Sequence, residues 1–245
     1  MIKTDKGYAQ LFKIYGKSET EIKEKISDIV KKSGDIAVST RRRNKEVHVL
    51  AESVEQDEEA AKAKIKPVAK EIKRALGFLV YSTKENETME EAVVRLLSKH
   101  DLTVTTAESC TGGMIASKIV NVPGASDVFN EGFITYSNKA KRKILDVSKN
   151  TLKKYGAVSE QTAKEMALGG VFAADADACI AVTGVAGPDG GTEEKPVGLV
   201  YIACCLKDEV TVKECHFHGT RMEVREQSAN AALDLLRISV LNNYH

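Results

Sequence analysis

The fold of the larger part of this chain is set by the stretch Leu102–Gly113, which reads LTVTTAESCTGG. Its first five residues are mostly apolar or β-branched and predict a strand over Leu102–Thr106. A serine and two glycines follow, and apolar residues at helical spacing predict a helix near Thr111–Val120. A strand that passes through a glycine-containing turn into a helix is typical of layered α/β domains.

The same alternation continues to the end of the chain. Further strands are expected at Gly132–Tyr136, Ala178–Thr183, Val197–Leu206 and Val210–Phe217, and further helices near Asn138–Leu145, Ser159–Ala173 and Met222–Leu241. Only Lys207-Asp208 and Glu209 separate the last two strands, which indicates a hairpin. We therefore predict a three-layer α/β/α domain with a mixed sheet over residues 89–245.

Residues 1–82 predict a smaller α/β domain with the element order βαββαβ, the split βαβ pattern. Ser18-x-x-Glu21 is a capping box at the first helix, and Asp57 opens the second helix. Gly77 is the expected end of that second helix, and Pro67 inside it is expected to kink or restart it. The polar residues 83–88 are interpreted as a linker, and the turn of the hairpin spans residues 41–45.

Composition limits the classes of function. The 245 residues carry a formal net charge of +1, with 42% hydrophobic and 29% charged residues, which is typical of a globular chain without a general attraction to nucleic acid or membrane. No apolar segment follows Met1, so no signal peptide is expected. The longest apolar stretch is interrupted by Asp175 and Asp177. The five cysteines form no CxxC pair, which favours reduced thiols and a cytoplasmic location.

Ser109 is the first candidate for catalysis. It lies where a strand meets a helix, and backbone N–H groups at a helix start have no partner within the helix. A nucleophile here would stand beside oxyanion donors at Thr111, Gly112 and Gly113. The alternative is an ordinary serine cap before a glycine-rich turn. Cys110 is a rival nucleophile, although a lone cysteine is more often a buried structural thiol.

A run of cations, with Lys139, Lys141 and Lys143, follows Tyr136-Ser137-Asn138. At 100° per residue, Lys139 and Lys143 share one face of the expected helix, and Lys141 points toward the side of Ile144 and Leu145. A lysine shielded from water can serve as a base, since lowering its pKa from ~10.4 to ~7.5 takes about 4 kcal/mol. The alternative is a solvated basic face.

Two later segments could hold a nucleotide. The loop Thr183–Gly191 contains four glycines but matches neither a Walker A loop nor a GxGxxG fingerprint. Arg221 and Arg225 lie four residues apart at a helix start and could clamp a phosphate, or pair with neighbouring glutamates on the surface. His216-x-His218 lacks further ligands nearby, so no metal site is expected.

Five ordered motifs together resemble one known family. They are AESCTGG (Ala107–Gly113), GFITYSNKAK (Gly132–Lys141), GAVSE (Gly156–Glu160), TGVAGPDGG (Thr183–Gly191) and KPVG (Lys195–Gly198). They resemble the C-terminal domain of the competence/damage-inducible CinA proteins, which also exists as a stand-alone nicotinamide-nucleotide amidohydrolase. This resemblance covers residues 89–242. Residues 1–82 are similar, more weakly, to the KH-like domain of the longer CinA proteins.

The resemblance implies hydrolysis of nicotinamide mononucleotide to nicotinate mononucleotide and ammonia, without cofactor or metal. It implies Ser109 as nucleophile, Lys141 as base and Tyr136 as an active-site tyrosine. Substrate-binding positions are expected at Thr111, Gly112, Gly113, Asn138, Gly184, Gly187, Arg221 and Arg225. A homodimer is expected. The chain has no room for the pyrophosphatase-associated domain of longer CinA proteins, so that activity is not expected.

Two other functions stay open from the sequence. One is a nucleotide-binding regulator that keeps the pocket without turnover. The other is RNA binding through residues 1–82, but the Gly-x-x-Gly loop of RNA-binding KH modules is absent and the net charge is near zero.

Overall fold

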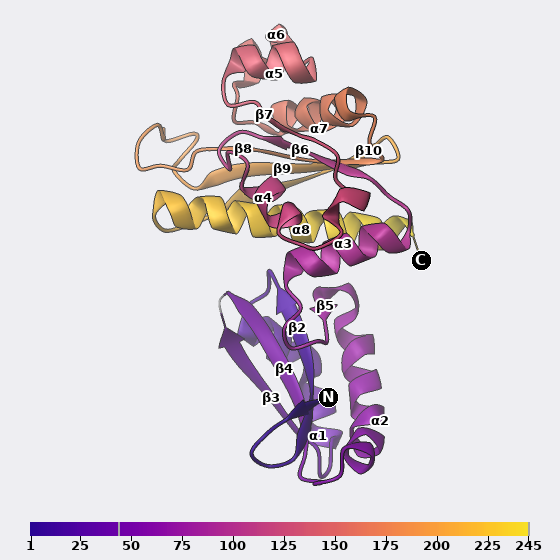
Figure 1. Ribbon diagram of the computed structural model, residues 1–245. Helices are drawn as coiled ribbons and strands as arrows, with labels where there is room; N and C mark the ends of the chain where they lie inside the picture. The colour runs from indigo at the N-terminus through magenta and orange to yellow at the C-terminus, as the bar shows by residue number, and fades with distance from the viewer. Residues whose placement is uncertain (44, 245) are drawn as a thin grey trace. The chain divides into compact units, whose positions relative to one another are not determined.

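The computed structural model describes residues 1–43 and 45–244 (Figure 1). Asn44, in the expected hairpin turn, and His245, at the end of the expected second domain, lie outside the described residues. The chain divides into two compact units, Met1–Ala92 and a second that begins at Val93. No helix of the described residues is long and apolar enough to cross a membrane.

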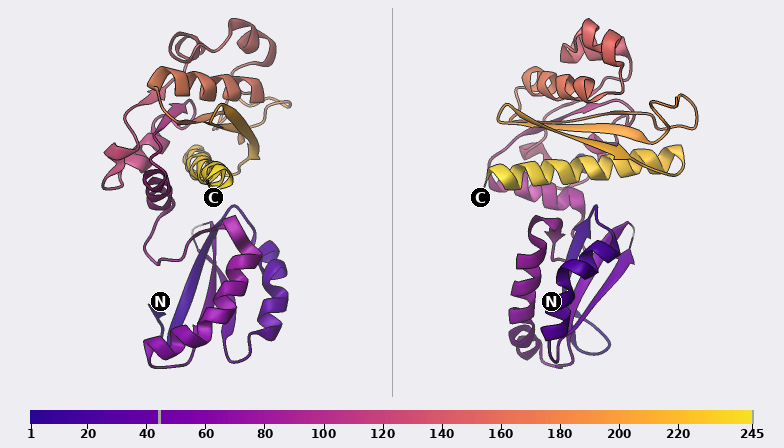
Figure 2. Two further views of the ribbon diagram at one scale, coloured as in Figure 1. Left: turned by 90° about the vertical axis from the view of Figure 1, so that its right-hand side faces the viewer. Right: turned by 180° about the vertical axis from the view of Figure 1, so that it is seen from behind.

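The first unit is an antiparallel sheet with two helices on one face (Figure 2). Its strands are β1 (Ile2–Lys3), β2 (Tyr8–Tyr15), β3 (Ala37–Arg43), β4 (Glu46–Ser53) and β5 (Val80–Ser82). The order is β1-β2-β4-β3, and β5 pairs with β2 farther along the strand. Apart from the short β1, which the sequence did not predict, this confirms the βαββαβ pattern.

The helices of this unit begin and end where the sequence indicates. They are α1 (Glu19–Lys32) and α2 (Glu58–Leu76), followed by the 3-10 turn η1 (Gly77–Leu79). Both hydrogen bonds of the Ser18 capping box form, and Asp57 accepts from the N–H of Ala60. Gly77 ends α2 with a positive φ of 49°. The expected restart at Pro67 is wrong: α2 runs through it as one helix, because its buried residues Ile65 and Ile72 hold both halves against the sheet.

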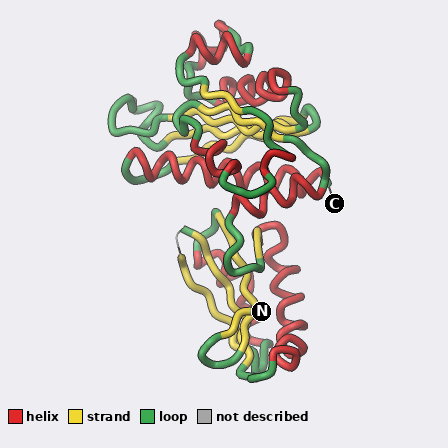
Figure 3. Tube along the Cα trace, in the orientation of Figure 1, coloured by secondary structure: helices red, strands yellow, loops and turns green. Residues whose placement is uncertain are grey.

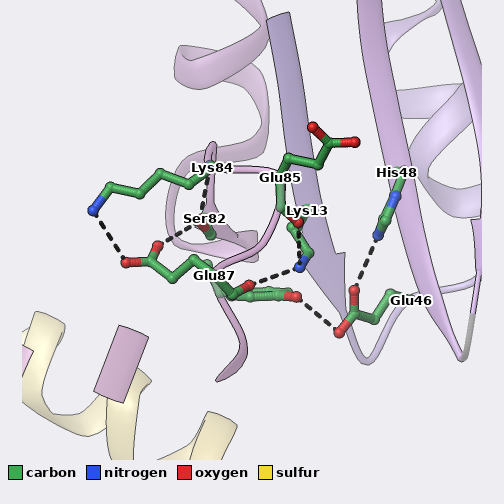
Figure 4. A network of polar contacts seen from close by, with 8 residues as sticks. Lys13, Glu46, His48, Ser82, Lys84, Glu85 and Glu87 are labelled. Atoms are coloured by element: carbon green, nitrogen blue, oxygen red, sulfur yellow. Dashed lines mark hydrogen bonds and ion pairs between the residues drawn. The ribbon is translucent and has the colours of Figure 1, made fainter. Parts of the chain in front are cut away.

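A buried polar network joins β2 to the residues that follow β5 (Figure 4). The Lys13 ammonium donates to the carbonyl oxygens of Glu87 at 2.7 Å and Glu85 at 3.5 Å. The Ser82 hydroxyl donates to the Glu87 carboxylate. Because a buried cation needs partners, Lys13 ties the polar segment after β5 to the sheet of its own unit.

The second unit is built on a mixed sheet with the strand order β10-β9-β8-β6-β7 (Figure 3). Its strands are β6 (Val104–Glu108), β7 (Gly132–Ile134), β8 (Ala178–Gly184), β9 (Leu199–Leu206) and β10 (Glu209–His216). β6 is parallel to β7 and β8, whereas β9 is antiparallel to β8 and β10. The predicted mixed sheet and terminal hairpin are therefore confirmed.

Helices cover both faces of this sheet, which makes three layers (Figures 1 and 2). One layer holds α5 (Asn138–Leu145), α6 (Lys149–Tyr155) and α7 (Glu160–Ala174), and the other holds α4 (Met114–Val120) and α8 (Arg221–Asn243). Helix α3 (Met89–Lys99) spans the boundary between the units, and η2 (Ala125–Asp127) follows α4. The sequence missed α6. It also placed the start of α4 near Thr111, but Gly112 and Gly113 adopt positive φ values of 59° and 91°, which delay it.

Two adjacent glycines on α7 bring α5 close to the sheet. A Cβ at Gly169 would lie 1.9 Å from the carbonyl oxygen of Leu145, at the end of α5. A Cβ at Gly170 would lie 2.4 Å from Sγ of Cys179 on β8. Since no side chain fits at either position, α7 can pack tightly between α5 and β8. This packing fixes the helix that carries Lys141.

Candidate active site

Ser109 and Lys141 meet at the carboxyl end of β6. Ser109 follows this strand directly, and its N–H donates to the carbonyl oxygen of Val182 on β8 at 3.0 Å. Its side chain is almost enclosed, with 8% of the residue exposed. A hydrogen bond of 2.9 Å joins Ser109 Oγ to Lys141 Nζ. The two residues that the sequence singled out for nucleophile and base are therefore in direct contact.

Lys141 is completely buried in α5. Its Nζ also donates to the carbonyl oxygens of Thr135 at 2.7 Å and Tyr136 at 3.4 Å. Burial lowers the pKa of Lys141 to about 8, because the charged form loses its hydration. A neutral amine has two N–H groups and one lone pair. The two carbonyl groups accept its N–H groups, which leaves the lone pair for the Ser109 hydroxyl.

The faces of α5 separate its three lysines. Lys141 and Leu145 point inward, whereas Lys139 and Lys143 are exposed. Ile144, which the sequence placed beside Lys141 on an apolar side, is 42% exposed. The helix has only eight residues, and its buried side chains are Lys141 and Leu145, which lie one turn apart on the same face. The inward direction of Lys141 is thus right, but its apolar side is narrower than expected.

Glu108 fixes the turn after Ser109 and was missed by the sequence analysis. Its carboxylate is fully buried and accepts from the N–H groups of Gly113 at 2.9 Å, Ile115 at 3.2 Å and Ala116 at 2.9 Å. A carboxylate at a helix start satisfies the free N–H groups and the helix dipole. The sequence did contain a signal for this cap, because Glu108 is an acidic residue at the end of a strand, just before a turn with two glycines.

The expected oxyanion donors need correction. The N–H of Gly113 is bound to Glu108, and the N–H of Gly112 donates to the carbonyl oxygen of Ser109 at 3.2 Å. Neither glycine can also serve a substrate without breaking the turn. Within residues 1–43 and 45–244, the N–H groups of Cys110 and Thr111 donate to no other residue, although the N–H of Cys110 faces its own thiol, and Cys110 lines the pocket. The residue after the nucleophile therefore offers the available donor.

The thiol of Cys110 is a poor nucleophile in this structure. Burial raises its pKa to about 11, and the residue is 6% exposed. A thiol with this pKa holds little thiolate near neutral pH. Ser109, with a buried amine at 2.9 Å, is the better placed nucleophile.

A pocket of about 310 Å³ opens beside Ser109 and Lys141. It is lined by Tyr136, predicted as an active-site tyrosine, and by three of the predicted binding residues, Gly184, Gly187 and Arg221. The remaining predicted residues, Thr111, Gly112, Gly113, Asn138 and Arg225, are not part of its lining. Asn138 is exposed on the first turn of α5, because Ser137 is the N-cap and Lys141 takes the inward position.

The pocket is also lined by Thr183 and Asp189, which were not among the individual residues predicted for the site. Thr183 is buried at the end of β8 and donates to the carbonyl oxygen of Ala157 at 2.7 Å, which joins two walls of the pocket. Asp189, in the glycine-rich loop, also lines the pocket. A Cβ at Gly184 would lie 2.6 Å from Cγ2 of Val200, so this glycine is required for packing between strands. The sequence motif alone does not distinguish a glycine that is required for packing from one that contacts the substrate.

The two arginines of α8 have different partners, although they lie one turn apart. Arg221 donates through Nη1 to the carbonyl oxygen of Gly187 at 2.7 Å and through Nη2 to the Tyr136 hydroxyl at 3.4 Å. Arg225 donates to the carbonyl oxygens of Cys110 and Thr111 at 3.1 and 2.7 Å. Arg221 faces the pocket, and Arg225 holds the turn. They do not form the shared phosphate clamp that their spacing indicated.

Metal ligands are not gathered at any point of the described chain. No group of three His, Cys, Asp or Glu side chains is arranged to bind a metal within residues 1–43 and 45–244. His216, one of the two histidines considered for a metal, pairs with Glu214 at 2.8 Å.

Fold and pocket together define a two-unit α/β protein with a buried serine–lysine pair in its second unit. The chain belongs to the CinA family. The model of the CinA C-terminal domain matches residues 86–240, and that of the damage-inducible protein CinA KH domain matches residues 9–82.

Curated relatives match nearly the whole chain. A competence-damage inducible protein from Caldicellulosiruptor saccharolyticus is 44% identical over 97% of this chain and 58% of its own length. A CinA-like protein from Kosmotoga olearia is 44% identical over 96% of this chain and 57% of its own length. The chain thus spans just over half the length of these relatives.

Solved structures match about two thirds of the chain. The competence/damage inducible protein CihA from Agrobacterium tumefaciens has a TM-score of 0.60 and 40% identity, and the match covers 64% of this chain and 99% of that protein. A CinA superfamily protein from Escherichia coli has a TM-score of 0.59 and 37% identity over 66% of this chain.

The charge state of Lys141 is directly measurable. In a ¹³C NMR titration of lysine Cε groups, one signal should titrate with a midpoint near pH 8, because burial disfavours the ammonium. That signal should be absent from Lys141→Arg. A Lys141 signal that titrates near the ordinary lysine value of ~10.4 would show that the amine is hydrated.

Proposed function

We propose that this protein is an amidohydrolase that converts nicotinamide mononucleotide to nicotinate mononucleotide and ammonia. The observation that carries this proposal is the 2.9 Å contact between Ser109 Oγ and the buried Lys141 Nζ. A serine is activated by an adjacent base, and a buried lysine whose pKa is about 8 supplies one at physiological pH. The resemblance to nicotinamide-nucleotide amidohydrolases supplies the substrate.

In the first half-reaction, Ser109 Oγ attacks the carboxamide carbon while neutral Lys141 takes the hydroxyl proton. The carbonyl oxygen becomes an oxyanion, which the N–H of Cys110 stabilises. The C–N bond then breaks, and the Lys141 ammonium gives its proton to the departing nitrogen. This step releases ammonia and leaves an ester on Ser109. Lys141 is neutral again.

In the second half-reaction, water attacks the ester and loses a proton to Lys141. The ester C–O bond breaks, and Lys141 returns the proton to Ser109 Oγ. The products are nicotinate mononucleotide and the free enzyme. Because the neutral amine is the base in both halves, turnover should increase as pH rises through about 8.

The rest of the pocket suits a nucleotide. Arg221 is an exposed residue of the pocket lining and is hydrogen-bonded to Gly187, which lines the pocket together with Gly184. We assign Arg221 to the phosphate, because a guanidinium can bind two phosphate oxygens. The Tyr136 hydroxyl, 3.4 Å from Arg221, is placed to orient the same group.

Two alternatives make different predictions. A nucleotide-binding regulator would bind nicotinamide mononucleotide but release no ammonia, and the contact between Ser109 and Lys141 disfavours it. RNA binding by residues 1–82 would show strong dependence on salt in a titration. A cytoplasmic location and a homodimer, both expected from the sequence, belong to this proposal.

Ser109→Ala should abolish ammonia release and leave the fold intact. Loss of a nucleophile costs on the order of 10³–10⁶ in kcat. Cys110→Ala should retain most activity, because its thiol is protonated near neutral pH. The measurement is ammonia release with circular dichroism as a folding control. The nucleophile would be the thiol if Cys110→Ala were inactive and Ser109→Ala active.

Arg221→Met should raise KM for nicotinamide mononucleotide by roughly 10- to 100-fold, because a charge-assisted contact to phosphate contributes about 1.5–3 kcal/mol. The same substitution should change KM for nicotinamide riboside, which lacks the phosphate, only slightly. Steady-state kinetics with both substrates provide the comparison. Equal losses would assign Arg221 to the structure of the loop at Gly187.

A further inference from the structure

Arg225 makes two hydrogen bonds to the turn after Ser109, yet the proposed mechanism does not use it. It lies on the second turn of α8, more than a hundred residues from the turn in sequence. Its Nε donates to the carbonyl oxygen of Cys110 at 3.1 Å and its Nη2 to that of Thr111 at 2.7 Å. A Cβ at Gly112 would lie 3.5 Å from the same Nη2. The guanidinium is thus seated directly on the backbone behind Ser109.

These contacts connect the guanidinium to the pocket through peptide groups. The carbonyl of Thr111 and the N–H of Gly112 belong to one planar trans peptide, so they point in opposite directions. The N–H of Gly112 donates to the carbonyl oxygen of Ser109 at 3.2 Å. That carbonyl in turn shares its peptide plane with the N–H of Cys110. A chain of two peptide groups therefore runs from Arg225 to the N–H of Cys110.

Hydrogen bonds in such a chain polarise one another. A cation on the carbonyl of Thr111 increases the positive character of the Gly112 N–H. The bond from that N–H to the Ser109 carbonyl does the same for the N–H of Cys110. Glu108 holds the far end of the turn by binding the N–H of Gly113, so the peptide planes keep their orientation.

We infer that Arg225 is a positioning residue that orients and polarises the Cys110 N–H as the oxyanion donor. This inference rests on the proposed function, since it assumes that Ser109 is the nucleophile. It assigns Arg225 to the transition state and leaves the nucleotide phosphate to Arg221. An oxyanion donor acts on charge that develops during the reaction, so its loss lowers kcat more than it changes KM.

The inference can be tested with a fluorophosphonate probe, independently of the natural substrate. Ser109 Oγ forms a bond to phosphorus, the P–F bond breaks and fluoride leaves, while Lys141 takes the serine proton. The phosphoryl oxygen of the probe occupies the position of the oxyanion. The rate of labelling, followed by intact-mass spectrometry, therefore reports the nucleophile and the oxyanion donor together.

Arg225→Gly should slow labelling of Ser109 by roughly 10- to 100-fold, less than the ~10²–10³ lost with an oxyanion donor itself. Guanidinium chloride at a low, non-denaturing concentration should restore part of the rate, because it can occupy the vacated site. With nicotinamide mononucleotide, kcat should fall and KM should stay within about threefold. Arg225→Lys should recover only part of the rate, since an ammonium cannot bind both carbonyl oxygens with the geometry of a guanidinium.

Arg237→Gly is the matched control. Arg237 lies on the same helix, is 3% exposed and pairs with Asp234 rather than with the turn. The Arg237→Gly variant should be less stable to heat, but its folded molecules should be labelled at the wild-type rate. Guanidinium should not change that rate.

Three results overturn the inference, and they are distinguishable. The wild-type protein could be labelled at Ser109 while folded Arg225→Gly is labelled at the same rate. This result would reject the role of Arg225 but leave the proposed nucleophile in place. A wild-type protein that is not labelled at Ser109 between pH 7 and about 9 would reject the proposed nucleophile and this inference together. Slow labelling of Arg225→Gly that guanidinium does not improve, with an equal loss in Arg237→Gly, would also reject it.

Discussion

The buried contact between Lys141 and Ser109 is the constraint on which the rest of the site depends. Lys141 has no exposed surface, so its charged form has an unfavourable free energy relative to a hydrated ammonium. The folded protein therefore binds this proton less tightly than the unfolded chain, where the pKa is ~10.4. Lys141 destabilises the fold below pH about 8, and this cost is relieved as pH rises toward ~10.4. Such a destabilising group is typical of a functional site.

The fold supplies the means to bury this amine. Gly169 and Gly170 let α7 pack against α5 and β8, so that the inward row of α5 reaches the end of β6. The pairing of β6 with β7 brings Thr135 into place, since its N–H donates to the carbonyl oxygen of Glu108 at 2.8 Å. The carbonyl of Thr135 then accepts from Lys141. One backbone segment therefore links the strand before Ser109 to the base.

Much of this could be predicted from the sequence, and the reasons are physical. The alternation of strands and helices, the capping box at Ser18 and the inward direction of Lys141 follow from local periodicity and cap chemistry. The start of α4 was misplaced because positive φ at Gly112 and Gly113 depends on how Glu108 caps the helix. The partner of Arg225 could not be predicted, because its contact spans more than a hundred residues and spacing shows only which face a residue occupies.

In the proposed mechanism, an ester on Ser109 lies between the amide and the acid. Hydroxylamine can intercept such an ester as a hydroxamate. Nicotinamide mononucleotide and the methyl ester of nicotinate mononucleotide carry the same acyl group but different leaving groups. If both form the same ester on Ser109, they must give the same ratio of hydroxamate to acid at each hydroxylamine concentration. Different ratios for the two substrates would show that no common acyl-enzyme forms, which contradicts the proposed mechanism.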